Sequence, residues 1–80
     1  MNDRDIQGHI EALVAEEQRL LEALETKLLA QEEQKRLEEV QVQLDRYYDL
    51  LRQRRAREEF GQDPDSAKLR PAETVERYLQ

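Results

Sequence analysis

The first third of the chain carries apolar residues at steps of three and four, a spacing that places side chains on one face of an α-helix. These residues are Ile6, Ile10, Leu13, Val14, Leu20, Leu21, Leu24 and Leu28. Asn2 or Asp3 can cap the free N–H groups in front of them, and Asp3 and Asp5 bring negative charge to the positive end of the helix dipole. The pattern predicts an amphipathic helix over about 3–27.

A second apolar stripe follows, with the alternating steps of three and four that form a heptad seam. It consists of Leu37, Val40, Leu44, Tyr47 and Leu51, with Leu50 and Tyr48 at its margins. Strong helix formers (Glu, Gln, Lys and Arg) fill the exposed positions. Gly61 suits the left-handed position just after a helix. We therefore expect a second long helix over about 31–60.

The segment 62–80 has a different character, because it contains both prolines of the chain. Asp63-Pro64 indicates a helix cap followed by Pro at the first helical position, and Arg70-Pro71 breaks that element. A short helix over about 71–79 can then place Val75, Tyr78 and Leu79 on one face. A helix of this length is not stable alone in water. We expect the tail either to dock on the hairpin or a partner, or to be disordered.

The stretch between the two stripes, LEALETKLLAQEEQKRLEE at 21–39, contains no ordinary turn residue apart from Thr26. Local composition therefore favours one continuous helix, although Glu32 and Glu33 also suit the first turn of a new one. The phase of the stripes favours reversal, because in one straight helix they would face directions roughly 160° apart. We predict an antiparallel hairpin whose turn lies within 25–32. The alternative is one long helix in a coiled-coil dimer.

Eighty residues make one small domain, with the hairpin at 1–61 and the tail at 62–80. Charged residues make up 40% of the chain and aromatic residues 5%, so Leu, Ile and Val must form the core. Two helices bury only one side of each stripe, and small scaffolds commonly gain stability by oligomerising. We expect an all-α homodimer in which two hairpins form a four-helix bundle. The residues of both stripes then form the core and the dimer seam.

Cysteine is absent, which removes disulfides and thiolate metal sites from consideration. The polar N-terminal residues do not resemble a secretory signal, and no apolar run approaches the length of a membrane span. These features suggest a cytoplasmic location and no contact with a membrane. The net charge of −6 makes nucleic acid an unlikely main partner, although it allows a local basic patch.

Two stretches of the chain carry a specific signature: DIQGHIEALVAEEQRLLE at 5–22, and LDRYYDLLRQRRAREEFGQDPDSAKLRPAETVERYLQ at 44–80. With LLRQRRA and the PETVERYLQ-like ending, they resemble a family of small bacterial proteins known as domain of unknown function 2630, over the whole chain. Relatives are often Gly-rich at the region matching 25–30, which implies a helix–loop–helix break. This chain departs there with ETKLLA, and it has Gln18 and Tyr48 where relatives often carry His and Trp. The resemblance implies no activity.

Four arginines crowd the end of the second predicted helix, at Arg52, Arg54, Arg55 and Arg57. Arginine binds phosphates and carboxylates in bidentate fashion, so the cluster is a candidate site for an acidic partner or for nucleic acid. The plainer interpretation is a solvated face. In that case the arginines pair with nearby acidic residues, namely Asp45, Asp49, Glu58 and Glu59.

Glu17 lies on the first stripe with Glu16 and His9 nearby, which raises the weak possibility of a metal site in a helical bundle. The chain lacks the Glu-x-x-His motif of such proteins, and His9 is about two turns from Glu16. We expect instead that Glu17 pairs with Arg or Lys or reaches the edge of the stripe. No cofactor is expected. Ser66 is the only serine and His9 the only histidine, so no catalytic set is recognisable.

The sequence therefore predicts a non-catalytic, homodimeric interaction or scaffold protein, with an unidentified protein as a possible further partner. Two alternatives stay open. One is a regulator that binds nucleic acid or another anion through the arginines, and the other is a metal-binding helical bundle.

Overall fold

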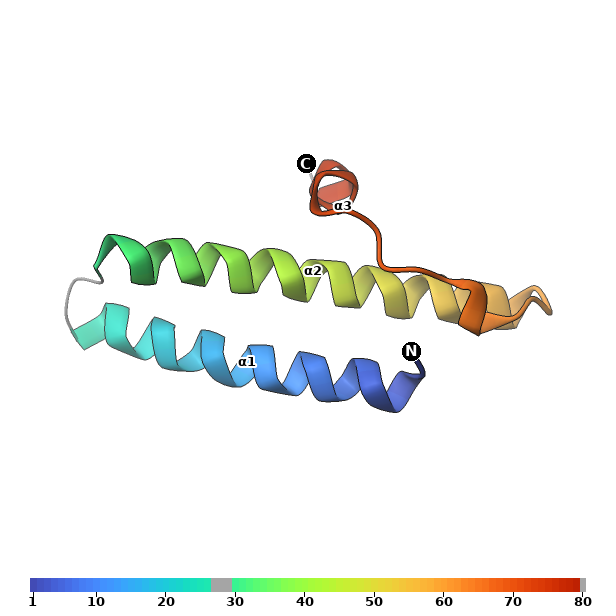
Figure 1. Ribbon diagram of the computed structural model, residues 1–80, viewed down its shortest axis with the longest axis horizontal. Coiled ribbons are helices and arrows are strands. Elements are labelled where there is room, and N and C mark those ends of the chain that lie inside the picture. Colours follow the sequence, from blue (N-terminus) through green and yellow to red (C-terminus); the bar gives the residue numbers. More distant parts are fainter. Residues whose placement is uncertain (27–29, 80) are drawn as a thin grey trace.

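The computed structural model describes residues 1–26 and 30–79, and over these ranges the chain is helical without strands. α1 (Asp3–Thr26) and α2 (Gln31–Glu59) lie side by side and run in opposite directions (Figure 1). A short 3₁₀ helix, η1 (Pro64–Ser66), and α3 (Ala72–Leu79) follow. The chain thus forms a hairpin rather than one continuous helix, and its longest dimension is 49 Å. Residues 27–29 of the predicted turn, including Leu28 of the first stripe, lie outside the described residues.

α1 begins with a reciprocal pair of hydrogen bonds between Asn2 and Asp5. The Asp5 N–H donates to Oδ1 of Asn2 at 2.8 Å, and the Asn2 N–H donates to the Asp5 carboxylate at 3.4 Å. These bonds satisfy two donors that have no partner within the helix. Of the two predicted caps, Asn2 therefore fills the role, while Asp3 is the first helical residue.

Thr26 closes α1 rather than capping α2. Its hydroxyl donates to the carbonyl oxygens of Ala23 and Glu22, at 3.2 and 3.3 Å. α2 starts instead from Ala30, whose N–H donates to Oε1 of Glu33 at 3.2 Å. Alanine has no side-chain acceptor, so α2 has only half of a capping box. The start of the second helix is therefore weakly specified.

α2 ends where the sequence predicted a left-handed glycine. Gly61 has a φ of +70°, and the Gln62 N–H reaches back to the Arg57 carbonyl at 2.7 Å. A residue with a Cβ is strained at this φ, which is why glycine suits the end of a helix.

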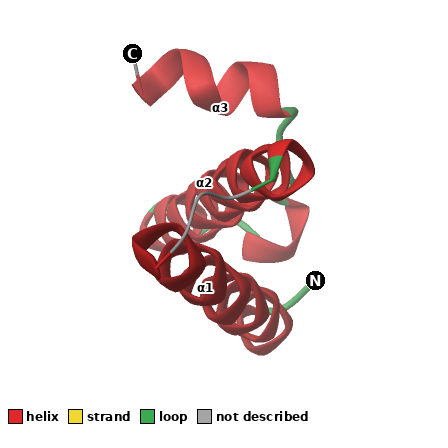
Figure 2. Ribbon diagram, turned by 90° about the vertical axis from the view of Figure 1, so that its left-hand side faces the viewer, coloured by secondary structure: helices red, strands yellow, loops and turns green. Residues whose placement is uncertain are grey.

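α2 is the central element of the molecule, with α1 on one side and the tail on the other (Figure 2). The core between α1 and α2 consists of Ile6, Ile10, Val40, Leu44 and Leu50, with Leu13, Val14, Tyr47 and Leu51 packed against it. Toward the turn the seam is thinner. Leu20, Leu21 and Leu37 are only half-buried there, and Leu24 is 45% exposed.

The tail docks on α2, which resolves the alternatives that the sequence left open. Gln53 donates to the Lys68 carbonyl at 3.0 Å, and Arg46 donates to the Arg70 carbonyl at 2.9 Å. Val75 on α3 is 1% exposed, so it anchors a helix that is too short to persist alone. Through these contacts the tail covers the outer face of α2 only over its C-terminal half.

Candidate functional site

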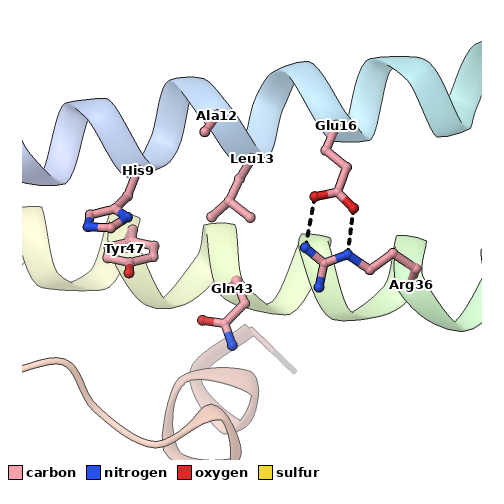
Figure 3. A pocket seen from close by; sticks show the side chains of 7 residues that line it. All are labelled: His9, Ala12, Leu13, Glu16, Arg36, Gln43 and Tyr47. Atoms are coloured by element: carbon pink, nitrogen blue, oxygen red, sulfur yellow. Dashed lines mark hydrogen bonds and ion pairs between the residues drawn. The ribbon is translucent and has the colours of Figure 1, made fainter.

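A groove of about 300 Å³ runs along one side of the seam between α1 and α2 (Figure 3). α1 contributes His9, Ala12, Leu13 and Glu16 to its lining, and α2 contributes Arg36, Gln43 and Tyr47. The antiparallel pairing of the helices brings residues from both ends of the sequence stripes into one hollow. Polar groups stand at each end of the groove, and aliphatic groups lie between them.

One end of the groove is an aromatic platform. The ring of His9 stacks on the ring of Tyr47, with centroids 5.1 Å apart and ring planes within 7° of parallel. Tyr47 is half-buried in the seam, whereas Tyr48 is 41% exposed at its margin. His9 is exposed, so one face of its ring packs on Tyr47 while the side chain remains open to solvent.

The other end of the groove is a bidentate ion pair across the seam. Arg36 donates to the two carboxylate oxygens of Glu16, at 2.5 and 2.8 Å. These hydrogen bonds hold the pKa of Glu16 below its usual value and raise the pKa of Arg36. The Glu39 carboxylate lies 3.6 Å from Nη1, the third guanidinium nitrogen of Arg36. The pair fixes the relative position of α1 and α2, but both partners are reached by solvent, which weakens its contribution to stability.

The metal candidates from the sequence do not converge. His9 and Glu16 line the same groove, but the Glu16 carboxylate is bound by Arg36. Glu17 is half-buried, and none of the described residues forms an ion pair with it. Of the two expectations for this side chain, a position at the edge of the apolar stripe is the one that agrees with these residues. Residues 1–26 and 30–79 hold no group of three His, Asp or Glu side chains that could bind an ion.

Arg54 is buried, unlike the solvated arginine that the plainer interpretation of the cluster predicted. Its side chain donates to the carboxylates of Asp3 and Asp65, at 2.6 and 3.0 Å. It also donates to the carbonyl oxygens of Met1 and Pro64, at 3.0 and 3.1 Å. These bonds raise the pKa of Arg54, the largest cause being the hydrogen bond that Arg54 donates to Asp3. We call this set of contacts the Arg54 clamp.

The other arginines of the cluster have different surroundings. Arg52 and Arg55 are exposed and Arg57 is half-buried. The predicted pairing with Asp49 is wrong, since this buried carboxylate accepts from Gln53 at 2.9 Å and lies 3.5 Å from Arg70. The four arginines therefore do not form one anion-binding surface.

A carboxyl pair joins α2 to α3. The pKa of Glu76 is raised, first by burial and then by its interaction with the Asp45 carboxyl. Among the described residues, no partner reaches the buried Oε1 of Glu76. Two carboxylates in contact repel each other, so this contact opposes docking of α3 whenever both are ionised.

Comparison with known proteins places the sequence in a family. The family model described as protein of unknown function DUF2630 matches residues 2–80. The chain belongs to this family. Uncharacterized proteins of Mycobacterium bovis and Mycobacterium tuberculosis are 44% identical to it over 77 residues, which cover 95% of this chain and 88% of theirs. No solved structure matches the chain.

In this DUF2630 protein, the polar contacts of Arg54 and Arg36 could not be inferred from the spacing of the apolar residues. The Arg54 clamp joins positions 51 and 11 residues apart, and Arg36 reaches Glu16 across 20 residues. In the sequence, the signals that could have pointed to Arg54 were its charge and its position beside the apolar stripe of the second helix. None of the described helices combines the length and the apolar composition that a bilayer crossing requires.

Proposed function

We propose that this protein is a non-catalytic interaction module that acts as a homodimer, in which two hairpins pack into a four-helix bundle. The observation that carries the proposal is the incomplete burial of the seam near the turn. Leu20, Leu21 and Leu37 are half-buried and Leu24 is 45% exposed, although all four belong to the apolar stripes. Bacterial relatives and a cysteine-free chain suit a cytoplasmic location, which is part of the proposal.

The position of the tail explains why the apolar seam is less covered at the turn end of the hairpin than at the other end. Its hydrogen bonds and ion pairs reach α2 at positions from Arg46 to Arg54, so the core gains a third layer over the C-terminal half of α2. The N-terminal part of α2 has α1 beside it and no tail above it (Figure 1). A second hairpin supplies the missing layer in a four-helix bundle.

We infer that a second copy of the chain covers the leucines near the turn. The incompletely buried leucines are at helical spacing, so they present a stripe to another helix rather than a cavity to a small molecule. A symmetric dimer pairs the same surface on both copies, so two incomplete seams cover each other without a further component.

Dimerisation is tested by light scattering after size exclusion at micromolar concentration. We expect a mass of twice the 9.6 kDa of one chain. Leu24→Gln should shift the mass toward that of one chain, because the substitution removes apolar contact area only where the dimer buries it. Glu25→Gln introduces the same side chain at a neighbouring exposed position and should leave the dimer intact.

Two results would contradict the proposal. A compact, stably folded wild-type chain with the mass of one copy would remove the dimer. A Leu24→Gln variant that stays fully dimeric would show that the turn-end leucines are not the interface. We do not extend the proposal to anion binding through the arginines, because Arg54 is held within the clamp.

A further inference from the structure

The groove beside the seam offers several hydrogen-bond donors that the protein itself leaves unused. Over the described residues, no hydrogen bond reaches the imidazole nitrogens of His9 or the hydroxyl of Tyr47. Both side chains line a hollow of about 300 Å³, and Tyr47 is half-buried there, where polar groups normally have partners. That volume lies at the lower end of the range for small-molecule sites.

Gln43 is oriented so that its donor side is also available. Its Oε1 accepts from Arg46 at 3.3 Å, and Arg46 is held in turn by the Arg70 carbonyl at 2.9 Å. With the amide oxygen engaged in this way, the Nε2 group is the free end of the side chain. Gln43 and Tyr47 are one turn apart on α2, so they are neighbours on its surface, and both line the groove.

The other lining residues disfavour a positively charged ligand and favour a ligand with an apolar part. Leu13 and Ala12 form the aliphatic middle of the groove, and the His9 ring lies next to it (Figure 3). Glu16 is the acidic residue of this lining, and Arg36 already occupies both of its oxygens. An incoming cation would therefore find no free carboxylate, whereas an incoming anion would find free donors.

We propose that this groove binds a small carboxylate that carries an aromatic or apolar body. The carboxylate accepts hydrogen bonds from the Gln43 amide and the Tyr47 hydroxyl, while the body lies on Leu13 and against the His9 ring. Charge-assisted hydrogen bonds of this kind are stronger than neutral ones, and they fix the orientation of the ligand. The inference goes beyond the proposed function, because Leu20, Leu21, Leu24 and Leu37 do not line the groove.

Three probes of one shape and different charge test the proposal: phenylacetate, phenylacetamide and phenethylamine. Their binding is followed by NMR through the imidazole signals of His9 and the methyl signals of Leu13. We expect saturable shifts with phenylacetate and a Kd on the order of 1 mM or tighter, which suits a small, open site. The amide and the amine should bind at least about tenfold more weakly, because neither accepts a charge-assisted hydrogen bond.

Two variants connect the binding to the named donors. Gln43→Leu should weaken phenylacetate binding about tenfold, the ratio expected for one hydrogen bond to a charged group. Tyr47→Phe removes only the hydroxyl and should weaken it in the same direction. Gln41→Leu makes the same change as the first variant at an exposed position of α2 outside the groove, and should leave the affinity unchanged.

The proposal is overturned if phenylacetate gives no saturable shift up to about 10 mM, a concentration at which even weak binding of this kind is visible. Equal binding of phenethylamine would overturn it too, as would equal losses in Gln41→Leu and Gln43→Leu. If the wild-type protein binds phenylacetate but has the mass of one chain, the result supports ligand binding in the groove and contradicts the proposed dimer. The two proposals thus fail separately.

Discussion

Arg54 holds three parts of the chain together with one guanidinium group. Asp3 belongs to α1, Met1 precedes it, and Pro64 and Asp65 form the start of η1. The Arg54 side chain is 7% exposed, whereas both carboxylates remain largely in solvent. A buried charge is costly unless hydrogen bonds and counter-charges satisfy it, and the clamp supplies both.

Replacing Arg54 should therefore destabilise the protein more than replacing any neighbouring arginine. We expect Arg54→Ala to lower the free energy of unfolding by about 1–3 kcal/mol, since hydrogen bonds to charged groups are lost while the freed carboxylates hydrate. Arg55→Ala, at an exposed position, should stay within about 0.5 kcal/mol of wild type. Urea denaturation measures both, and equal effects would argue against the clamp.

The ion pair between Glu16 and Arg36 should give stability a component that depends on pH. The pKa of Glu16 is lowered in the folded protein, so the pair stabilises the fold above the ordinary pKa of 4.5. This contribution is lost as the pH falls through the lowered pKa. The difference in melting temperature between wild type and Glu16→Gln should therefore shrink from pH 7 toward pH 3. A difference that stays constant would show that the pair contributes no such component.

The two long helices and the short third one follow from patterns that are local in sequence. Apolar residues at helical spacing, Gly61 after α2 and the two prolines of the tail each act on their own segment. To predict that the chain reverses between the two long helices, it was also necessary to compare the directions in which their apolar stripes face. The contacts of the groove and of the Arg54 clamp were not predictable in this way, because they join residues 10 to 53 positions apart in the sequence. Periodicity shows which face of a helix is apolar, but not which polar groups at its edge will meet.

The start of α2 has no side-chain cap, and it can be improved. Ala30 has extended φ and ψ angles of −62° and 158°, which suit a capping residue, but no side-chain acceptor. Ala30→Ser should raise the free energy of unfolding by about 0.5–1 kcal/mol, because its hydroxyl can accept from a free N–H of the first turn. Ala15→Ser, at an exposed position inside α1, should give no gain. Thermal melts compare the two, and equal effects would exclude capping as the cause.

Docking of α3 should strengthen as the solution becomes more acidic. The pKa of Glu76 is raised in the docked state, so docking is most favourable below the ordinary pKa of 4.5 and is penalised as the pH rises through the raised pKa. Hydrogen exchange at residues 72–77, corrected for the intrinsic effect of pH, should show greater protection at pH 5 than at pH 7.

Glu76→Gln should give the stronger protection already at pH 7, because the amide can donate to Asp45 without a second negative charge. Glu73→Gln is a matched change at an exposed position of the same helix and should give none of this gain. Protection that rises with pH in the wild type would contradict the role of the carboxyl pair.

At the scale of the whole molecule, α2 supports two separate surfaces. Its inner face packs on α1 and its outer face receives the tail, so the core is a stack of layers only one helix wide. Such a stack has a large surface for its volume, and small domains of this kind have little stability in reserve. The open turn end is where a second copy can add to the core.

Stability should accordingly depend on protein concentration. A homodimer that gains part of its core on association melts at a higher temperature when it is more concentrated, because mass action favours the folded dimer. We expect the melting temperature of the wild type to rise over a hundredfold range of concentration, and that of Leu24→Gln to stay nearly constant. A wild-type melting temperature independent of concentration would contradict dimer formation in this range.

The Arg54 clamp also links the two ends of the chain. Asp3 near the start and Asp65 in the tail both accept hydrogen bonds from one guanidinium group. Loss of either carboxylate leaves a buried charge with fewer partners. A substitution in the tail should therefore also weaken the packing at the start of α1, although the two segments are far apart in the sequence.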